Sequence, residues 1–121
     1  MDTETARTGR IIGCAISVSD VLGCGFLERV YESALAHELT KAGFAIETQS
    51  PFSVRYDGIV VGEFRADLIV DRAVIVEVKA AKAIDLAHQS QALNYMKATG
   101  LKVGLILNFG TPRLGIKRLI R

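Results

Sequence analysis

Three residues in the middle of the chain place acidic and basic groups in apolar surroundings. Asp67 lies in "RADLIV", and Glu77 and Lys79 lie in "AVIVEVKA". Runs of branched apolar residues are typical of buried strands, where an unpaired ionised group is costly. Side chains two apart on a strand share a face, so Glu77 and Lys79 point to the same side. Either these charges lie at a sheet edge in water, or a specific arrangement compensates them.

The connection between the two segments decides whether Asp67 joins Glu77. A connection of residues 71–73 places Asp67 directly opposite Glu77, whereas a two-residue turn makes Asp67 face away from it. We predict the odd-numbered connection, or a bulge that restores the same register.

Two neighbouring carboxylates resist ionising beside each other, and a divalent cation removes that objection. Mg²⁺ takes a few carboxylate oxygens and keeps waters for a phosphate ligand, and Mn²⁺ is expected to substitute for it. The predicted ligands are Asp67, Glu77 and the main-chain carbonyl of Val78. Lys79 would orient or help deprotonate an attacking water and offset charge in the transition state. The alternative is a partly buried ion pair of Lys79 with one of the two acids.

A later segment, "IDLAHQSQALNYMKATG", has a helical pattern with Asp85 as the expected N-cap. Gln91 and Tyr95 stand four residues apart and share a face, from which both can donate to a phosphate. His88 lies one turn earlier and is a further candidate for a phosphate contact. The alternative is an ordinary amphipathic helix whose inward side chains are Leu86, Leu93 and Met96.

The remaining pattern predicts the elements that would position these groups. Helices are expected over residues 5–22 and 26–42, separated by "GCG". Glu28 falls in the first turn of the second helix, where it either interacts with the helix dipole or supplies another oxygen to the metal. Strands follow, with Asp57-Gly58 as a hairpin turn. The predicted order α-α-β-β-β-β-α-β-β indicates an α/β (or α+β) fold with a central mixed sheet of four to five strands flanked by helices.

Length and composition are typical of one globular domain over residues 1–121. Half of the 121 residues are hydrophobic and 23% are charged, which excludes a disordered chain. No apolar run approaches the roughly 18 residues of a membrane span, and the polar start is unlike a secretory signal, so we expect a cytoplasmic protein. The net charge of +2 decides little. The C-terminal segment is locally basic and forms either a solvated strand or a phosphate-facing edge.

The spacing of Asp67 from Glu77-Val78-Lys79 resembles the D…ExK core of the PD-(D/E)XK nuclease superfamily. "GFLERVY" places Gly25, Glu28 and Tyr31 as in the signature of the small bacterial GxxExxY proteins, a family assigned to the exonuclease-like branch of that superfamily. Gln91 and Tyr95 are similar to the Gln-x-x-x-Tyr motif of that branch. The resemblance extends over almost the whole chain, from "RIIGCAI" to "NYMKATGLKVGLILNFG".

This resemblance implies a restriction-endonuclease-like core and a Mg²⁺-dependent nuclease that acts on nucleic acid, DNA more than RNA. A catalytically silent nucleic-acid-binding or protein-interaction module on the same scaffold is the alternative. One departure stands out, because relatives commonly have Glu-Val-His where this chain has Ser17-Val18-Ser19. Because the chain is small for gripping a duplex, we expect a homodimer, formed through the basic last strand or the first helix.

Overall fold

The structure of the chain is a computed structural model that describes residues 3–121. Met1 and Asp2 of the expected domain lie outside the described residues. The elements, in chain order, are α1 (Thr3–Leu22), α2 (Glu28–Lys41), β1 (Ile46–Tyr56), β2 (Ile59–Val70), β3 (Val74–Lys79), α3 (Leu86–Thr99), β4 (Val103–Asn108) and β5 (Gly115–Ile120). Among residues 3–121, no helix has the length and apolar character needed to cross a membrane.

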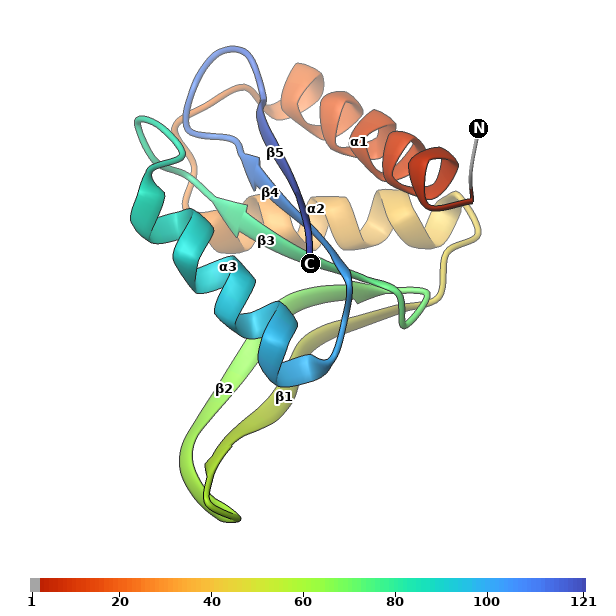
Figure 1. Cartoon of the computed structure of the whole chain (residues 1–121). Helices are drawn as coiled ribbons and strands as arrows, with labels where there is room; N and C mark the ends of the chain where they lie inside the picture. Colours follow the sequence, from red (N-terminus) through yellow and green to blue (C-terminus); the bar gives the residue numbers. More distant parts are fainter. Residues whose placement is uncertain (1–2) are drawn as a thin grey trace.

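The strands form one mixed sheet in the order β1-β2-β3-β4-β5. Neighbouring strands are antiparallel except β3 and β4, which are parallel and joined through α3. Helices α1 and α2 lie on one side of the sheet and α3 on the other (Figure 1). The mixed five-stranded sheet flanked by helices confirms the predicted architecture.

The core consists of one apolar cluster on each side of the sheet. The larger cluster packs Ile11 and Ala15 of α1 and Leu35 of α2 against strand residues such as Val76 and Leu107. The smaller cluster packs Ala92 and Met96 of α3 against Ile75 and Ile106. Alternate residues of β3 thus contribute to opposite clusters, which explains why this strand is apolar along nearly its whole length.

Three strands precede α3, where the sequence suggested four. The stretch from Ile46 to Tyr56 is one strand. It contains Pro51, which is tolerated because β1 is an edge strand of the sheet. Ile59–Val70 is likewise continuous. The Asp57-Gly58 turn joins them as expected, with positive φ at both residues (54° and 79°).

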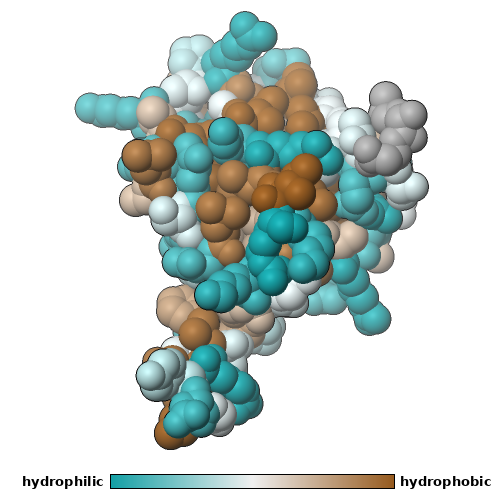
Figure 2. Space-filling model, viewed as in Figure 1, coloured by the Kyte–Doolittle hydropathy of each residue, from teal (hydrophilic) through white to brown (hydrophobic). Residues whose placement is uncertain are grey.

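The distal part of the β1–β2 hairpin, residues 51–65, extends away from the body of the molecule, and we call it the arm (Figure 1). The backbone ladder between β2 and β3 is limited to three residue pairs, from Val70 with Val74 to Leu68 with Val76. Beyond them β2 pairs with β1 alone. Hydrophobic side chains are visible on the arm's surface (Figure 2), and Tyr56, Ile59 and Val61 are exposed.

Helix α3 has the expected ends but a different inward face. Asp85 caps its N-terminus by accepting from His88 N, and Gly100 ends it in the left-handed conformation. Leu86 is 79% exposed and Leu93 is also exposed, so the alternative in which both face the core is wrong. Ala92 is buried in their place beside Met96, because small side chains let this helix lie close to the sheet.

Candidate active site

Asp67 and Glu77 meet where β2 separates from β3. The connection between the strands has three residues, the odd number that was predicted. The resulting register places Asp67 opposite Glu77. Asp67 Oδ2 accepts a hydrogen bond from Val78 N at 2.8 Å, and Asp67 N donates to Glu77 Oε2 at 3.4 Å. The Asp67 carboxylate therefore serves as the acceptor that the diverging main chain of β2 no longer provides.

Glu77 is a buried acid whose pKa is strongly perturbed. Glu77 is only 3% exposed. Burial raises the pKa of Glu77 to about 9, with further contributions from the side-chain hydrogen bond and the charge of Asp67. The main-chain N–H of Asp67 and the charge of Lys79 act in the opposite direction. At neutral pH the Glu77 carboxyl is thus protonated and paired with Asp67.

The second carboxyl oxygen of Glu77 indicates whether a cation could bind at this site. Within residues 3–121, Glu77 Oε1 is buried and has no hydrogen-bond partner. A buried acceptor without a donor, beside a second carboxylate, is the arrangement that a hard divalent cation can satisfy in place of the proton. Asp67 and Glu77 therefore fit a divalent metal.

Glu28 lies near this site but does not complete a cluster of three acids. In the described part of the chain, no three His, Cys, Asp or Glu side chains are grouped as a metal site. Glu28 Oε2 instead accepts from Ala80 N at 3.4 Å, just beyond the end of β3. Two carboxylates are enough for Mg²⁺, which usually keeps several of its waters.

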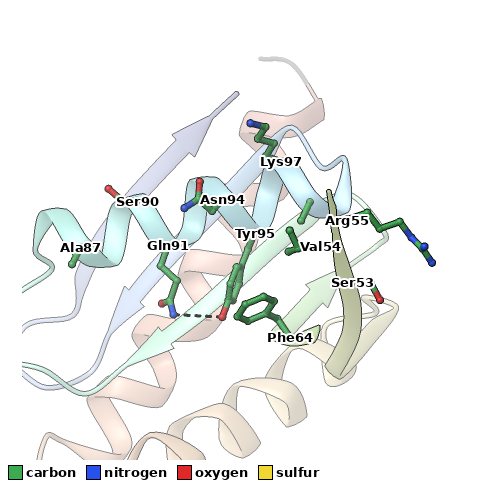
Figure 3. Close-up of a pocket in the computed structure, with 11 residues that line it drawn as sticks. Ser53, Val54, Arg55, Phe64, Ala87, Ser90, Gln91, Asn94, Tyr95 and Lys97 are labelled. Carbon is green, nitrogen blue, oxygen red and sulfur yellow. Dashed lines mark hydrogen bonds between the residues drawn. The ribbon is translucent and has the colours of Figure 1, made fainter. Parts of the chain in front are cut away.

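Lys79 is linked to α3 by a chain of side-chain hydrogen bonds. Lys79 Nζ donates to Gln91 Oε1 at 2.9 Å, and Gln91 Nε2 donates to Tyr95 Oη at 3.4 Å (Figure 3). Burial, followed by the charges of Glu77 and Asp67, raises the pKa of the Tyr95 hydroxyl. The structure thus brings together the polar residues predicted from β3 and from α3.

Tyr31 positions the segment that leads into α2. Its hydroxyl donates to Gly23 O at 2.7 Å and accepts from Phe26 N at 3.1 Å. The buried ring stacks on Phe109 with 4.8 Å between the ring centroids. Tyr31 thus holds the loop before Glu28 as a packing residue with a polar tip.

The comparison with protein families decides which family this site belongs to. The family model described as the PD-(D/E)XK nuclease superfamily matches residues 5–119. The chain belongs to this superfamily. Asp67, Glu77 and Lys79 occupy the two strands that meet at the point of divergence, in the order of the D…ExK pattern.

A solved structure shows the same fold. This PD-(D/E)XK chain is similar to the crystal structure of SSO0001, with a TM-score of 0.57 and 18% sequence identity over 77% of this chain and 50% of that one. The chain thus spans about half the length of that protein. The similarity supports the restriction-endonuclease-like fold and, at this identity, nothing beyond the fold. No curated protein matches the chain.

Asn108 is a site-supporting residue of this PD-(D/E)XK domain that the sequence did not indicate. It is 1% exposed and lies at the end of β4, beside Lys79. Its Oδ1 accepts from Ala81 N at 2.9 Å and Gly110 N at 3.1 Å, and its Nδ2 donates to Ala81 O at 2.9 Å. Asn108 therefore fixes the main chain two residues after Lys79. The signal for it was a polar residue ending a fully apolar strand.

Glu32 was also missed, although it follows Glu28 by one helical turn. Its Oε1 accepts from Gln49 Nε2 at 2.8 Å. Burial is the largest cause that raises the pKa of Glu32, and the charge of Asp67 acts in the same direction. A further acid from α2 thus lies close enough to Asp67 for their charges to interact.

His88 and the two serines of α1 that were singled out in the sequence make no hydrogen bond to Asp67 or Glu77 in the described part of the chain. His88 forms a capping box with Asp85, in which His88 Nδ1 accepts from Asp85 N at 3.3 Å. Ser17 and Ser19 lie on α1, where Ser17 donates to Gly13 O and Ser19 is buried. The hydrogen bonds of His88 and Ser17 are thus local to their own helices.

Proposed function

We propose that this chain is a metal-dependent nuclease that hydrolyses phosphodiester bonds in DNA. The observation that carries this proposal is the Asp67–Glu77 pair, in which a buried carboxyl keeps an unpartnered oxygen next to Lys79. Membership of the PD-(D/E)XK nuclease superfamily supports nuclease-type chemistry.

In this proposal each residue has a distinct task. Asp67 and Glu77 hold a Mg²⁺ ion, with the Val78 carbonyl and Glu28, directly or through water, as further oxygen ligands. Bound Mg²⁺ supplies a Lewis acid for the phosphoryl oxygen and lowers the pKa of a coordinated water. Lys79 orients the attacking water and offsets the negative charge that develops on phosphorus.

Hydrolysis then joins the water oxygen to phosphorus while this water releases one proton to solvent, and the bond from phosphorus to one sugar oxygen breaks. The leaving oxygen takes up a proton from solvent. Gln91 and Tyr95 donate hydrogen bonds to the phosphate, and Gln91 is already in contact with Lys79 at 2.9 Å. His88, at the start of α3, is a more remote candidate for a phosphate contact.

We also propose that the chain is of the GxxExxY type within the superfamily. Gly25, Glu28 and Tyr31 form its signature, and each has a local task in the structure. Gly25 has a φ of 116°, a conformation that favours glycine, in the loop that Tyr31 holds. Glu28 reaches the main chain after Lys79.

The second candidate function is a catalytically silent nucleic-acid-binding or protein-interaction module on the same scaffold. One observation favours it, because residues 3–121 contain no group of three acidic or histidine side chains arranged for a metal. Under this alternative, Asp67 and Glu77 remain a protonated pair that serves the fold alone.

Metal titration and DNA cleavage separate the two candidates. Isothermal calorimetry with Mn²⁺ should show binding that is lost in Asp67→Asn, a variant that keeps an acceptor for Val78 N. Incubation with Mg²⁺ and plasmid or linear DNA should show cleavage.

Lys79→Met should reduce cleavage roughly 10²–10³-fold, the usual cost of removing one group that stabilises charge in the transition state, while metal binding persists. Lys82→Met is the matched control, because Lys82 is an exposed lysine close by in the chain. Absence of metal binding and of cleavage in the unmodified protein would refute the nuclease proposal.

We propose that the protein acts as a homodimer. The strand β5 supports this because it is an edge of the sheet and carries exposed Ile116, Lys117 and Ile120. Light scattering after size exclusion should give twice the chain mass of 13.1 kDa. A mass of one chain at micromolar concentration would contradict the dimer.

A further inference from the structure

A groove of about 940 Å³ separates the arm from α3, next to the candidate active site. This volume is near the upper end of the roughly 300–1,000 Å³ typical of ligand pockets. Figure 3 shows Phe64 and Tyr95 between the two walls, with Arg55 and Lys97 at the margins. The amides Gln91 and Asn94 come from α3, and Ser53 and Val54 come from the arm.

The groove contains a partly exposed aromatic surface. Phe64 is 42% exposed, although its ring centroid lies 5.8 Å from that of Phe52 and 5.6 Å from that of Tyr95. Gly62 lies beneath this ring, because a Cβ there would come within 2.9 Å of Phe64 Cε2. The local sequence thus leaves space for the ring to lie along the strand and remain open to the groove.

The charge of the groove is positive. Arg55 and Lys97 are its charged lining residues, and no acidic side chain lines it within the described part of the chain. Neither cation forms a salt bridge with an acid of residues 3–121. A register shift between Val54 and Arg55 interrupts the alternation of β1, and both residues line the groove.

The groove is continuous with the candidate active site through α3. Gln91 and Tyr95 line it, and Gln91 Oε1 accepts from Lys79 Nζ at 2.9 Å. A chain bound along the groove would therefore contact Gln91, the hydrogen-bond partner of Lys79.

We propose that this groove binds single-stranded nucleic acid, with a base stacked on Phe64 and backbone phosphates at Arg55 and Lys97. An aromatic face is useful only to an unpaired base, because the faces of a base inside a duplex are covered by its neighbours. Aromatic platforms flanked by cations are the usual surface for single strands. The inference rests on the proposed function, since it names single strands or frayed ends as the substrate of that site.

Binding without metal tests the groove separately from catalysis. Fluorescence anisotropy in EDTA should show tighter binding of a labelled oligothymidylate than of a blunt duplex of equal length. Phe64→Ala should weaken single-strand binding roughly 5- to 150-fold, the fold-change expected from losing one base–aromatic stack. Tyr56→Ala is the matched control, because Tyr56 is an aromatic residue of the same hairpin that is 75% exposed and does not line the groove.

A second variant distinguishes the loss of base stacking from the loss of the fold. The chain contains no tryptophan, so Phe64→Trp introduces a single indole at the proposed stacking position. This variant should retain single-strand affinity, and its fluorescence should be quenched by oligothymidylate and remain unchanged on adding duplex.

The cations give a further independent measurement. Loss of one phosphate contact to a single strand reduces the slope of log affinity against log salt concentration by about 0.7. Arg55→Ala and Lys97→Ala should each reduce the slope by this amount. Lys41→Ala, on α2 across the sheet from the groove, should leave it unchanged.

The outcomes distinguish this inference from the proposed function. If Phe64→Ala binds like the unmodified protein, or if the introduced indole is not quenched at saturating oligothymidylate, the inference is wrong even where DNA is cleaved. If the Phe64 variants behave as expected while no metal supports cleavage, the inference stands and the nuclease proposal falls. Equal affinity for single strand and duplex would also overturn the inference.

Discussion

Replacing Glu77 with glutamine should stabilise the metal-free protein while it abolishes metal binding. Glutamine has the shape of a protonated glutamic acid, which is the form that burial and Asp67 impose on Glu77 in the fold. In the unfolded chain the same carboxyl ionises near its usual pKa of 4.5, against about 9 in the fold. Folding of the unmodified protein at neutral pH therefore requires the uptake of a proton that the glutamine variant does not need.

The sign of the pH dependence follows from this difference. Between about pH 4.5 and pH 9 the folded state binds more protons than the unfolded state, so the free energy of unfolding falls as the pH rises. Each pH unit in this window contributes about 1.4 kcal/mol. At pH 7.5 the upper limit of the Glu77 contribution is thus about 4 kcal/mol, reduced to the extent that the site relaxes or admits water.

Urea unfolding of both proteins in EDTA, from pH 5 to pH 9, measures this effect. Glu77→Gln should match the unmodified protein near pH 5 and become more stable as the pH rises. The raised pKa of Glu32 acts in the same direction in both proteins and cancels in the difference. Added Mn²⁺ should stabilise the unmodified protein alone, because the ion replaces the proton. Parallel stability curves across this range would show that Glu77 is not held protonated.

Three further substitutions test how the fold supports the site. Asn108→Ala removes three hydrogen bonds and should lower the free energy of unfolding by about 2–4 kcal/mol; thermal unfolding that is unchanged would contradict this. Gly104→Ala brings a Cβ within 2.7 Å of Met96 Sδ and 3.2 Å of Ile75 Cγ2 and should destabilise by about 1–3 kcal/mol in urea unfolding; an unchanged unfolding curve would contradict this. Asp85→Ala removes the cap of α3 and should lower stability by about 1 kcal/mol, a loss that Asp85→Asn should largely avoid.

Local rules were sufficient to predict the meeting of the two acids. Side chains alternate along a strand, so the separation of Asp67 from Glu77 and an odd connection between the strands determine that they face each other. The Asp57-Gly58 turn and the ends of α3 follow from equally local preferences for positive φ and for capping.

The packing of α3 and the arm depended on contacts between distant segments. The helical period of "LAHQSQALNYMKAT" allows Leu86 and Leu93 to face inward, and the sequence does not reveal that Gly104 opposes this helix. With no side chain at Gly104, Met96 fills the space and Ala92 lies close to the sheet. Likewise, Asn108 gains its meaning only from Ala81, which lies 27 residues away in the chain.

The separation of β2 from β3 connects the candidate active site with the groove. If the ladder between these strands continued past Leu68 and Val76, a main-chain acceptor would bond Val78 N, and Asp67 would have no place between the strands. The same continuation would hold the arm in the plane of the sheet and close the space between Phe64 and α3. One departure of a strand therefore frees the carboxylate that would bind the proposed cation and creates the wall along which the proposed substrate strand would lie.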